Sequence, residues 1–138
     1  MPDRPSRSVV VAGALDVVCI LVFVAIGRSS HHDGVTVGGM VSTAWPFLVG
    51  AACGWGAIRA WRHPLQTFPV GVAIWVACVG VGMVLRVIAG QGTAVAFVIV
   101  ALAFLGLALL GWRTVARMAG ERGPLAGFGR TRSTNAVE

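Results

Sequence analysis

Asp16 is an acidic residue inside an apolar stretch that covers residues 8–27. A carboxylate in the middle of a segment that crosses a bilayer costs roughly 2.5–3.5 kcal/mol, so it needs a partner, water or a proton. One interpretation is a protonatable site for a proton or a cation. The alternative is a structural carboxylate, neutral or ion-paired, that holds two helices together. Both interpretations stay open at the level of the sequence.

Two arginines and a histidine form a second polar group. Arg28 and Arg86 each stand near the end of an apolar stretch, and His31 follows Arg28 closely. Such arginines commonly extend to the membrane surface, but here they could line a polar pocket. Arg28 cannot reach Asp16 along their shared helix, and Arg86 lies about 12 Å from the depth of Asp16 at 1.5 Å per residue. We therefore expect a proton or solute site at Asp16, with Arg28, His31 and Arg86 at its outer entrance.

Other residues with reactive side chains do not form a recognisable site. The run His-His-Asp at 31–33 does not predict a metal centre, because adjacent histidines usually point apart whereas helical metal ligands repeat every four residues. Cys19, Cys53 and Cys78 are expected to be small buried hydrophobic residues, and their odd number does not indicate a disulfide framework. The sequence shows no nucleophile and base pair and no phosphate-binding glycine loop. It predicts no metal, no cofactor, no catalytic residue and no enzyme activity.

The composition excludes most water-soluble folds. Of the 138 residues, 57% are hydrophobic and 12% are charged, whereas a soluble domain is about 25% charged. A transmembrane helix requires about 20 predominantly apolar residues, and four stretches separated by polar turns meet that requirement. The sequence predicts an all-α, polytopic integral membrane protein with four transmembrane helices. The predicted spans cover about residues 8–27, 44–61, 69–88 and 93–112.

The distribution of arginine predicts the orientation of this transmembrane domain, residues 8–115. Nine of the 11 basic residues, all of them arginines, fall in or beside the segments expected on one side of the membrane. Because arginine marks cytoplasmic loops, we expect both termini in the cytoplasm and the protein in the cell (inner) membrane. The tails, residues 1–7 and 116–138, would then be cytoplasmic, the second one disordered. The net charge of +6 indicates attraction to anionic lipid rather than to nucleic acid.

Two pairs of segments suggest an internal repeat. Residues 43–47 and 93–97 share the pattern Thr-Ala-x-x-Phe, and a Trp-Arg pair follows each of them, at 61–62 and 112–113. One interpretation is two helical hairpins in the same orientation, as in parallel-repeat transporters. The alternative, which we favour, is convergence, because Trp, Arg and turn-forming residues gather at helix ends in any membrane bundle.

Small residues mark the faces that are expected to pack. Gly50 and Gly54 have the GxxxG spacing that lets two helices approach closely. In the first span, Ala12, Asp16 and Cys19 share one helical face, which predicts that Asp16 points into the bundle. GxxxG is a weak motif in a chain with 19 glycines. It therefore does not distinguish contact within one chain from dimerisation.

Four segments carry a family resemblance. They are Ile26-Gly27-Arg28-Ser29-Ser30-His31, Ala44-Trp45-Pro46-Phe47-Leu48-Val49-Gly50, Gly82-Met83-Val84-Leu85-Arg86, and the stretch from Gly92 to Arg113. As a set, over about residues 10–115, they resemble a bacterial and archaeal membrane-protein family known as domain of unknown function 3054. The resemblance implies a four-helix integral membrane protein with no assigned activity. It also implies that the family's polar positions are Asp16, Arg28, His31, Arg86 and Arg113.

Two functional hypotheses follow. The first is a small transporter or channel subunit for a proton or small solute, with Asp16 as the protonatable site; four helices enclose little volume, so a homodimer is expected. The second is a non-catalytic membrane adaptor or scaffold whose intramembrane polar residues are structural. A solvated cavity that joins Asp16 to the outer face would favour transport, whereas a carboxylate sealed by hydrogen bonds would favour the structural role. The substrate, if there is one, is not identified by the sequence.

Overall fold

The computed structural model describes residues 7–30 and 34–121. Within these ranges the chain forms four long α-helices and no strand. They are α1 (Arg7–Ser30), α2 (Val37–Ile58), α3 (Val72–Ile88) and α4 (Val95–Glu121). Two short segments lie between α2 and α3, namely η1 (Ala60–Arg62) and η2 (Thr67–Gly71).

The four helical segments are each long and apolar enough to cross a membrane, with η2 and α3 counted together as Thr67–Ile88. Many large apolar side chains face outward; Val37 is 84% exposed and Leu107 is 78% exposed. Such a surface is unsuited to water and suited to hydrocarbon. The prediction of an all-α protein with four transmembrane helices is confirmed.

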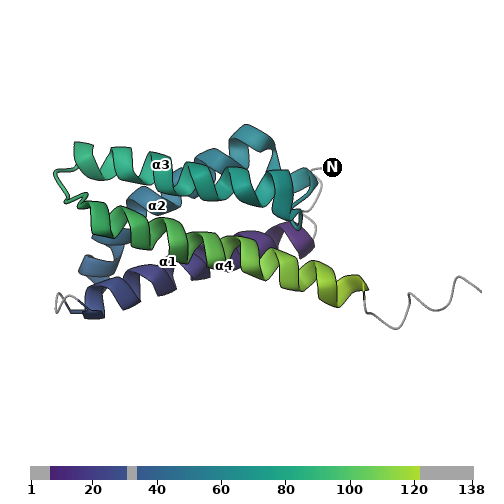
Figure 1. Ribbon diagram of the computed structural model, residues 1–138, viewed down its shortest axis with the longest axis horizontal. Coiled ribbons are helices and arrows are strands. Elements are labelled where there is room, and N and C mark those ends of the chain that lie inside the picture. The colour runs from purple at the N-terminus through teal and green to yellow at the C-terminus, as the bar shows by residue number, and fades with distance from the viewer. Residues whose placement is uncertain (1–6, 31–33, 122–138) are drawn as a thin grey trace, which may run out of the picture.

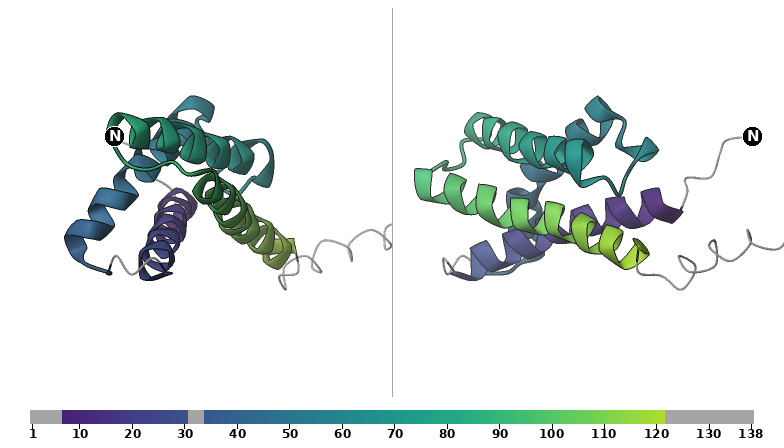
Figure 2. Two further views of the ribbon diagram at one scale, coloured as in Figure 1. Left: turned by 60° about the vertical axis from the view of Figure 1, so that its left-hand side comes forward. Right: turned by 45° about the vertical axis from the view of Figure 1, so that its right-hand side comes forward.

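The helices pack as a closed ring in which α1 contacts α2 and α4, and α3 also contacts α2 and α4. α1 and α3 run in one direction and α2 and α4 in the other (Figures 1 and 2). The start of α1 and the end of α4 therefore lie at the same end of the bundle as residues 59–66 (Figure 1). We call this the Arg113 end, and the opposite end, which carries residues 89–94, the Arg86 end.

The bounds of α2 and α4 differ from those of the predicted spans. α2 begins at Val37 instead of residue 44 because Thr36 caps it, its hydroxyl accepting the backbone N–H of Gly39 at 3.1 Å. α4 continues as a helix to Glu121 and so extends into the predicted tail, residues 116–138. Residues 122–138 lie outside the described part of the chain.

Glycine allows α2 and α3 to pack closely. A Cβ atom on Gly50 would lie 2.7 Å from the carbonyl oxygen of Cys78, and one on Gly54 would lie 2.9 Å from the Cα of Ile74. On α3, a Cβ atom at Gly82 would lie 2.9 Å from the ring of Phe47. The GxxxG motif of α2 therefore serves a contact within one chain.

A group of phenylalanines joins three of the helices in the core. The ring centroids of Phe23 in α1 and Phe47 in α2 are 5.5 Å apart, with the rings edge to face. Phe97 and Phe104 in α4 lie 6.0 and 5.6 Å from Phe23. These rings occupy the bundle between the Arg86 end and the region around Asp16, so the polar groups at the two ends are separated by apolar packing.

Candidate functional site

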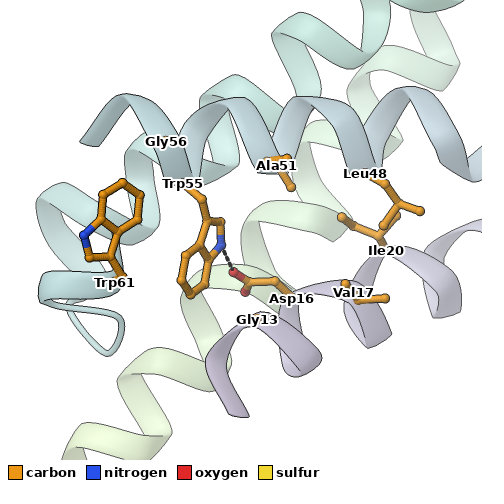
Figure 3. A pocket seen from close by; sticks show the side chains of 10 residues that line it. Gly13, Asp16, Val17, Ile20, Leu48, Ala51, Trp55, Gly56 and Trp61 are labelled. Carbon is orange, nitrogen blue, oxygen red and sulfur yellow. Dashed lines mark hydrogen bonds between the residues drawn. The ribbon is translucent and has the colours of Figure 1, made fainter. Parts of the chain in front are cut away.

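Each oxygen of the Asp16 carboxylate accepts two hydrogen bonds. Oδ1 accepts from Nη1 of Arg113 at 2.8 Å and from Nε1 of Trp112 at 2.9 Å. Oδ2 accepts from Nη2 of Arg113 at 2.7 Å and from Nε1 of Trp55 at 2.9 Å, the bond drawn in Figure 3. Asp16 itself is only 2% exposed. Side chains from α1, α2 and α4 therefore meet at one buried carboxylate.

Arg113 is fully buried and is the ion-pair partner of Asp16. Besides its two bonds to the carboxylate, its Nε donates to the carbonyl oxygen of Pro64 at 3.1 Å and its Nη1 to that of Leu109 at 3.0 Å. Its guanidinium carbon also lies 4.4 Å from the ring centroid of Trp112. Arg113 thus connects α4 to α1 and to the loop that follows α2. We call these contacts of Asp16 and Arg113 the Asp16 network.

Glycine makes room for the arginine side chain at the start of α3. A Cβ atom on Gly71, at the end of η2, would lie 3.0 Å from Cδ of Arg113 and 3.0 Å from Leu110. The carbonyl oxygen of Pro64, which the guanidinium contacts, belongs to the loop just before η2. Residues of α1, α2, α4, η2 and the 59–66 loop therefore pack around or next to the Asp16 network.

The chemistry of this network is that of a satisfied buried ion pair. The two parallel N–H···O bonds are the bidentate geometry that makes arginine–carboxylate pairs strong and directional. Among the described residues, no buried side-chain nitrogen or oxygen lacks a hydrogen-bond partner. Removing either partner of such a buried pair leaves an uncompensated charge in a low-dielectric interior, which is strongly destabilising.

Sequence reasoning did not assign Arg113 as this partner. The apolar residues of the predicted fourth span end at Trp112, which puts Arg113 just outside that span, among the arginines expected in the cytoplasm. α4 in fact extends to Glu121, so Arg113 lies two turns inside the helix. Asp16 lies about as far from the start of α1 as Arg113 lies from the end of α4. Because these two helices are antiparallel neighbours, a comparison of the two depths would have found the pair.

Arg86 lies at the other end of the bundle and folds over the turn between α3 and α4. Its Nε and Nη2 donate to the carbonyl oxygen of Gly92 at 3.1 and 2.7 Å, and its Nη1 donates to Oε1 of Gln91 at 2.8 Å. Its guanidinium carbon lies 4.4 Å from the ring centroid of Phe97. These contacts make Arg86 part of the hairpin turn.

Gln91 links Arg86 to α2. Its Nε2 donates to the carbonyl oxygen of Ser42 at 3.0 Å. Pro46 lies inside α2, four residues after Ser42, and it has no N–H to donate to that carbonyl. The side chain of Gln91 therefore bonds a carbonyl oxygen that proline leaves without its helical donor.

Arg28 has a similar place in the first hairpin. Its Nε donates to the carbonyl oxygen of Gly34 at 2.9 Å, and its Nη1 donates to the hydroxyl of Thr43 at 3.1 Å. Arg28 and Arg86 thus each bond to a glycine carbonyl six residues later in the chain. This parallel does not decide between two hairpin repeats and convergence, the interpretation that we favour from the sequence.

Of the four residues predicted for a proton or solute site, the three that the structure describes are not brought together as one cluster. Asp16 pairs with Arg113, whereas Arg28 and Arg86 bond to the turns at the Arg86 end. His31 lies outside the described residues. In the ranges that are described, no three His, Cys, Asp or Glu side chains are placed to hold a metal ion. Of the three cysteines expected to be buried, only Cys78 is, and its thiol donates to the carbonyl oxygen of Phe47 at 3.4 Å; Cys19 is partly buried and Cys53 is exposed, toward the surface of the bundle.

Four apolar helices around a buried ion pair define a polytopic α-helical membrane protein. The family model described as "Protein of unknown function (DUF3054)" matches residues 13–116, and the chain belongs to this family. The match includes every residue of the Asp16 network. No curated protein and no solved structure is significantly similar to the chain.

Proposed function

We propose that the protein is a non-catalytic, non-transporting membrane scaffold or adaptor, and that the Asp16 network is a structural clamp. The observation that carries the proposal is the saturation of the Asp16 carboxylate. Both of its oxygens are bonded to Arg113 and to an indole N–H of Trp55 or Trp112. In a membrane such a clamp supplies what apolar packing lacks, because lipid gives no hydrophobic drive for helices to associate.

The contacts of Asp16 argue against a proton path. A carrier residue must bind and release its proton or solute, so it must alternate between exposure to the two sides of the membrane. Asp16 is almost fully buried, and apolar rings of Phe23, Phe47 and Phe97 lie between it and the Arg86 end. Arg28 and Arg86, which we expected at an entrance, instead donate hydrogen bonds to the carbonyl oxygens of Gly34 and Gly92 in the hairpin turns. These features support the structural alternative over transport.

The proposal also covers the location of the protein. We place it in the cell (inner) membrane with the Arg113 end toward the cytoplasm, because Arg7, Arg59, Arg62 and Arg117 are exposed at that end. The Asp16 network is complete within one chain, so the scaffold does not require a second copy. A homodimer would be compatible with it but is not part of the proposal.

Proton flux into vesicles tests this function. Purified protein is reconstituted in liposomes that contain a pH-sensitive dye, and a pH step or a potassium-diffusion potential is applied. We expect wild-type vesicles and Asp16→Asn vesicles to acidify at the rate of empty liposomes, while a protonophore collapses the gradient in all three. Faster acidification by the wild type that Asp16→Asn abolishes, with the helical circular-dichroism signal of the variant retained, would overturn the proposal in favour of transport.

A further inference from the structure

α1 and α2 enclose an apolar groove that the Asp16 network does not fill. Its volume is about 370 Å³, within the range of about 300–1,000 Å³ that is typical of ligand pockets. It runs between the two helices from Trp61 toward Ile20 and Leu48, and Asp16 and Trp55 line it on the way (Figure 3). Because α2 ends near Trp61, one end of the groove lies at the Arg113 end of the bundle and the other lies deeper along the helices.

Small residues create the space. Gly13 of α1 and Gly56 of α2 both line the groove, and a Cβ atom on either would meet no other atom within 4 Å. This contrasts with Gly50 and Gly54 on the opposite face of α2, where the backbone of α3 occupies the corresponding space. The two faces of α2 are thus built differently: one is filled by α3, and the other leaves room along α1.

The groove offers an apolar surface even though a carboxylate and an indole line it. The Asp16 oxygens and the Trp55 nitrogen are bonded to each other or to Arg113 and Trp112. Apolar side chains such as Val17, together with the faces of the indole rings, make up the rest of the lining. A ligand in the groove therefore meets hydrocarbon and aromatic surface, which suits an alkyl chain better than a polar solute.

Positive charge lies at the open end of the groove. Trp61 belongs to η1. Arg59 comes directly before this short segment and Arg62 ends it, and both arginine side chains are exposed. Asp16, which also lines the groove, is buried and paired with Arg113, so its charge does not neutralise Arg59 and Arg62. Basic residues next to a site between transmembrane helices attract anionic lipid head groups, and tryptophan favours the depth of those head groups.

We propose that the groove between α1 and α2 binds an anionic phospholipid. One acyl chain lies along Ile20 and Ala51, and the phosphate of the head group lies against Arg59 and Arg62, with Trp61 at the boundary between the two. The apolar groove alone would accept any lipid chain. The adjacent arginines select an anionic head group, and this selection does not depend on whether the protein transports a solute.

Lipid titration of the delipidated protein, read by native mass spectrometry, tests the proposal. Phosphatidylglycerol is compared with phosphatidylcholine of the same acyl chains. We expect one phosphatidylglycerol to be retained, bound at least tenfold more tightly than phosphatidylcholine. Equal affinity for the two lipids would overturn the proposal.

Three variants separate the groove from general attraction to lipid. Arg59→Asn, which suits the positive φ of 52° at this position, and Arg62→Gln should each weaken phosphatidylglycerol binding about fivefold. Gly56→Leu, which fills the groove, should abolish the bound lipid for both head groups. Arg117→Gln removes an exposed arginine from α4 and is the matched control.

The variants also define the outcomes that contradict the site. An equal effect of Arg117→Gln and Arg62→Gln would mean that only the net charge matters. Full binding by a folded Gly56→Leu protein would mean that the lipid lies elsewhere. If Gly56→Leu does not fold, Gly13→Leu fills the same groove from α1, and its retention of phosphatidylglycerol would equally overturn the proposal.

Discussion

Asp16 in α1 and Arg113 in α4 form a bidentate ion pair whose shorter contact, Oδ2 to Nη2, is 2.7 Å. The pair joins the first and last helices across 97 residues of sequence. Trp55 brings α2 to the same carboxylate, and the Pro64 carbonyl brings the loop before α3 to the same guanidinium. Stability of the Arg113 end should therefore depend on each of these contacts.

The two indole donors can be removed without removing the rings. Trp55→Phe and Trp112→Phe each delete one N–H bond to the charged carboxylate, and such bonds contribute about 1.5–3 kcal/mol. Both indoles are only partly buried, so we expect losses toward the lower value in the free energy of unfolding, measured by circular dichroism in mixed detergent. Trp45→Phe, at an exposed tryptophan, is the control. Losses no larger than that of the control would show that the indoles do not support Asp16.

Two glycines on α2 should respond differently to the same substitution. Gly50→Ala places a methyl group 2.7 Å from the backbone oxygen of Cys78, whereas Gly56→Ala meets no atom within 4 Å. We expect Gly50→Ala to lower stability by about 1–3 kcal/mol through overpacking, and Gly56→Ala to leave it unchanged or slightly higher. Equal melting temperatures for the two variants would contradict the close packing of α2 on α3.

Gln91 and Pro46 should be energetically coupled through the carbonyl of Ser42. Gln91→Ala removes the donor to this oxygen, at a cost of about 1 kcal/mol. In a Pro46→Ala background the restored backbone N–H can bond the same carbonyl, so the cost of Gln91→Ala should fall. The measurement is the unfolding free energy of the four proteins. An identical cost of Gln91→Ala in both backgrounds would argue against this role of Gln91.

The orientation is open to a direct test. A dual reporter fused after Glu138, active as phosphatase only outside the cytoplasm and fluorescent only inside, should report a cytoplasmic C-terminus. The reason is the excess of exposed arginines at the Arg113 end. As a control, the same reporter inserted after Gln91 should report the opposite side. Phosphatase activity of the C-terminal fusion would reverse the proposed orientation.

The fold could be predicted from the sequence because hydropathy fixes the number of spans. The ends of the helices could not be predicted equally well. The start of α2, Val37-Gly38-Gly39, resembles a turn in composition, and it is helical because Thr36 caps it. The end of α4 is charged, so an apolar window stops at Trp112 while the helix continues to Glu121.

The candidate site could also be predicted in part, because a charged residue is conspicuous inside an apolar span. The small-residue face of the first span predicts that Asp16 points inward, and the energetic cost of a buried acid predicts that it has a partner. The identity of the partner depended on the length of α4, which places Arg113 inside the bundle. The roles of Arg28 and Arg86 depended on turn geometry, which composition does not encode.

A double-mutant cycle between Asp16 and Arg113 tests the central claim most directly. Asp16→Asn and Arg113→Met are made singly and together, and unfolding free energies are measured in mixed detergent, with Arg117→Met as the arginine control. Each single variant leaves one buried charge unpaired, so we predict that each lowers the unfolding free energy by about 3–5 kcal/mol. The loss in the double variant should be smaller than the sum of the two single losses by at least about 2 kcal/mol. Additive losses within about 0.5 kcal/mol, as expected for the pair Asp16→Asn and Arg117→Met, would contradict the structural clamp.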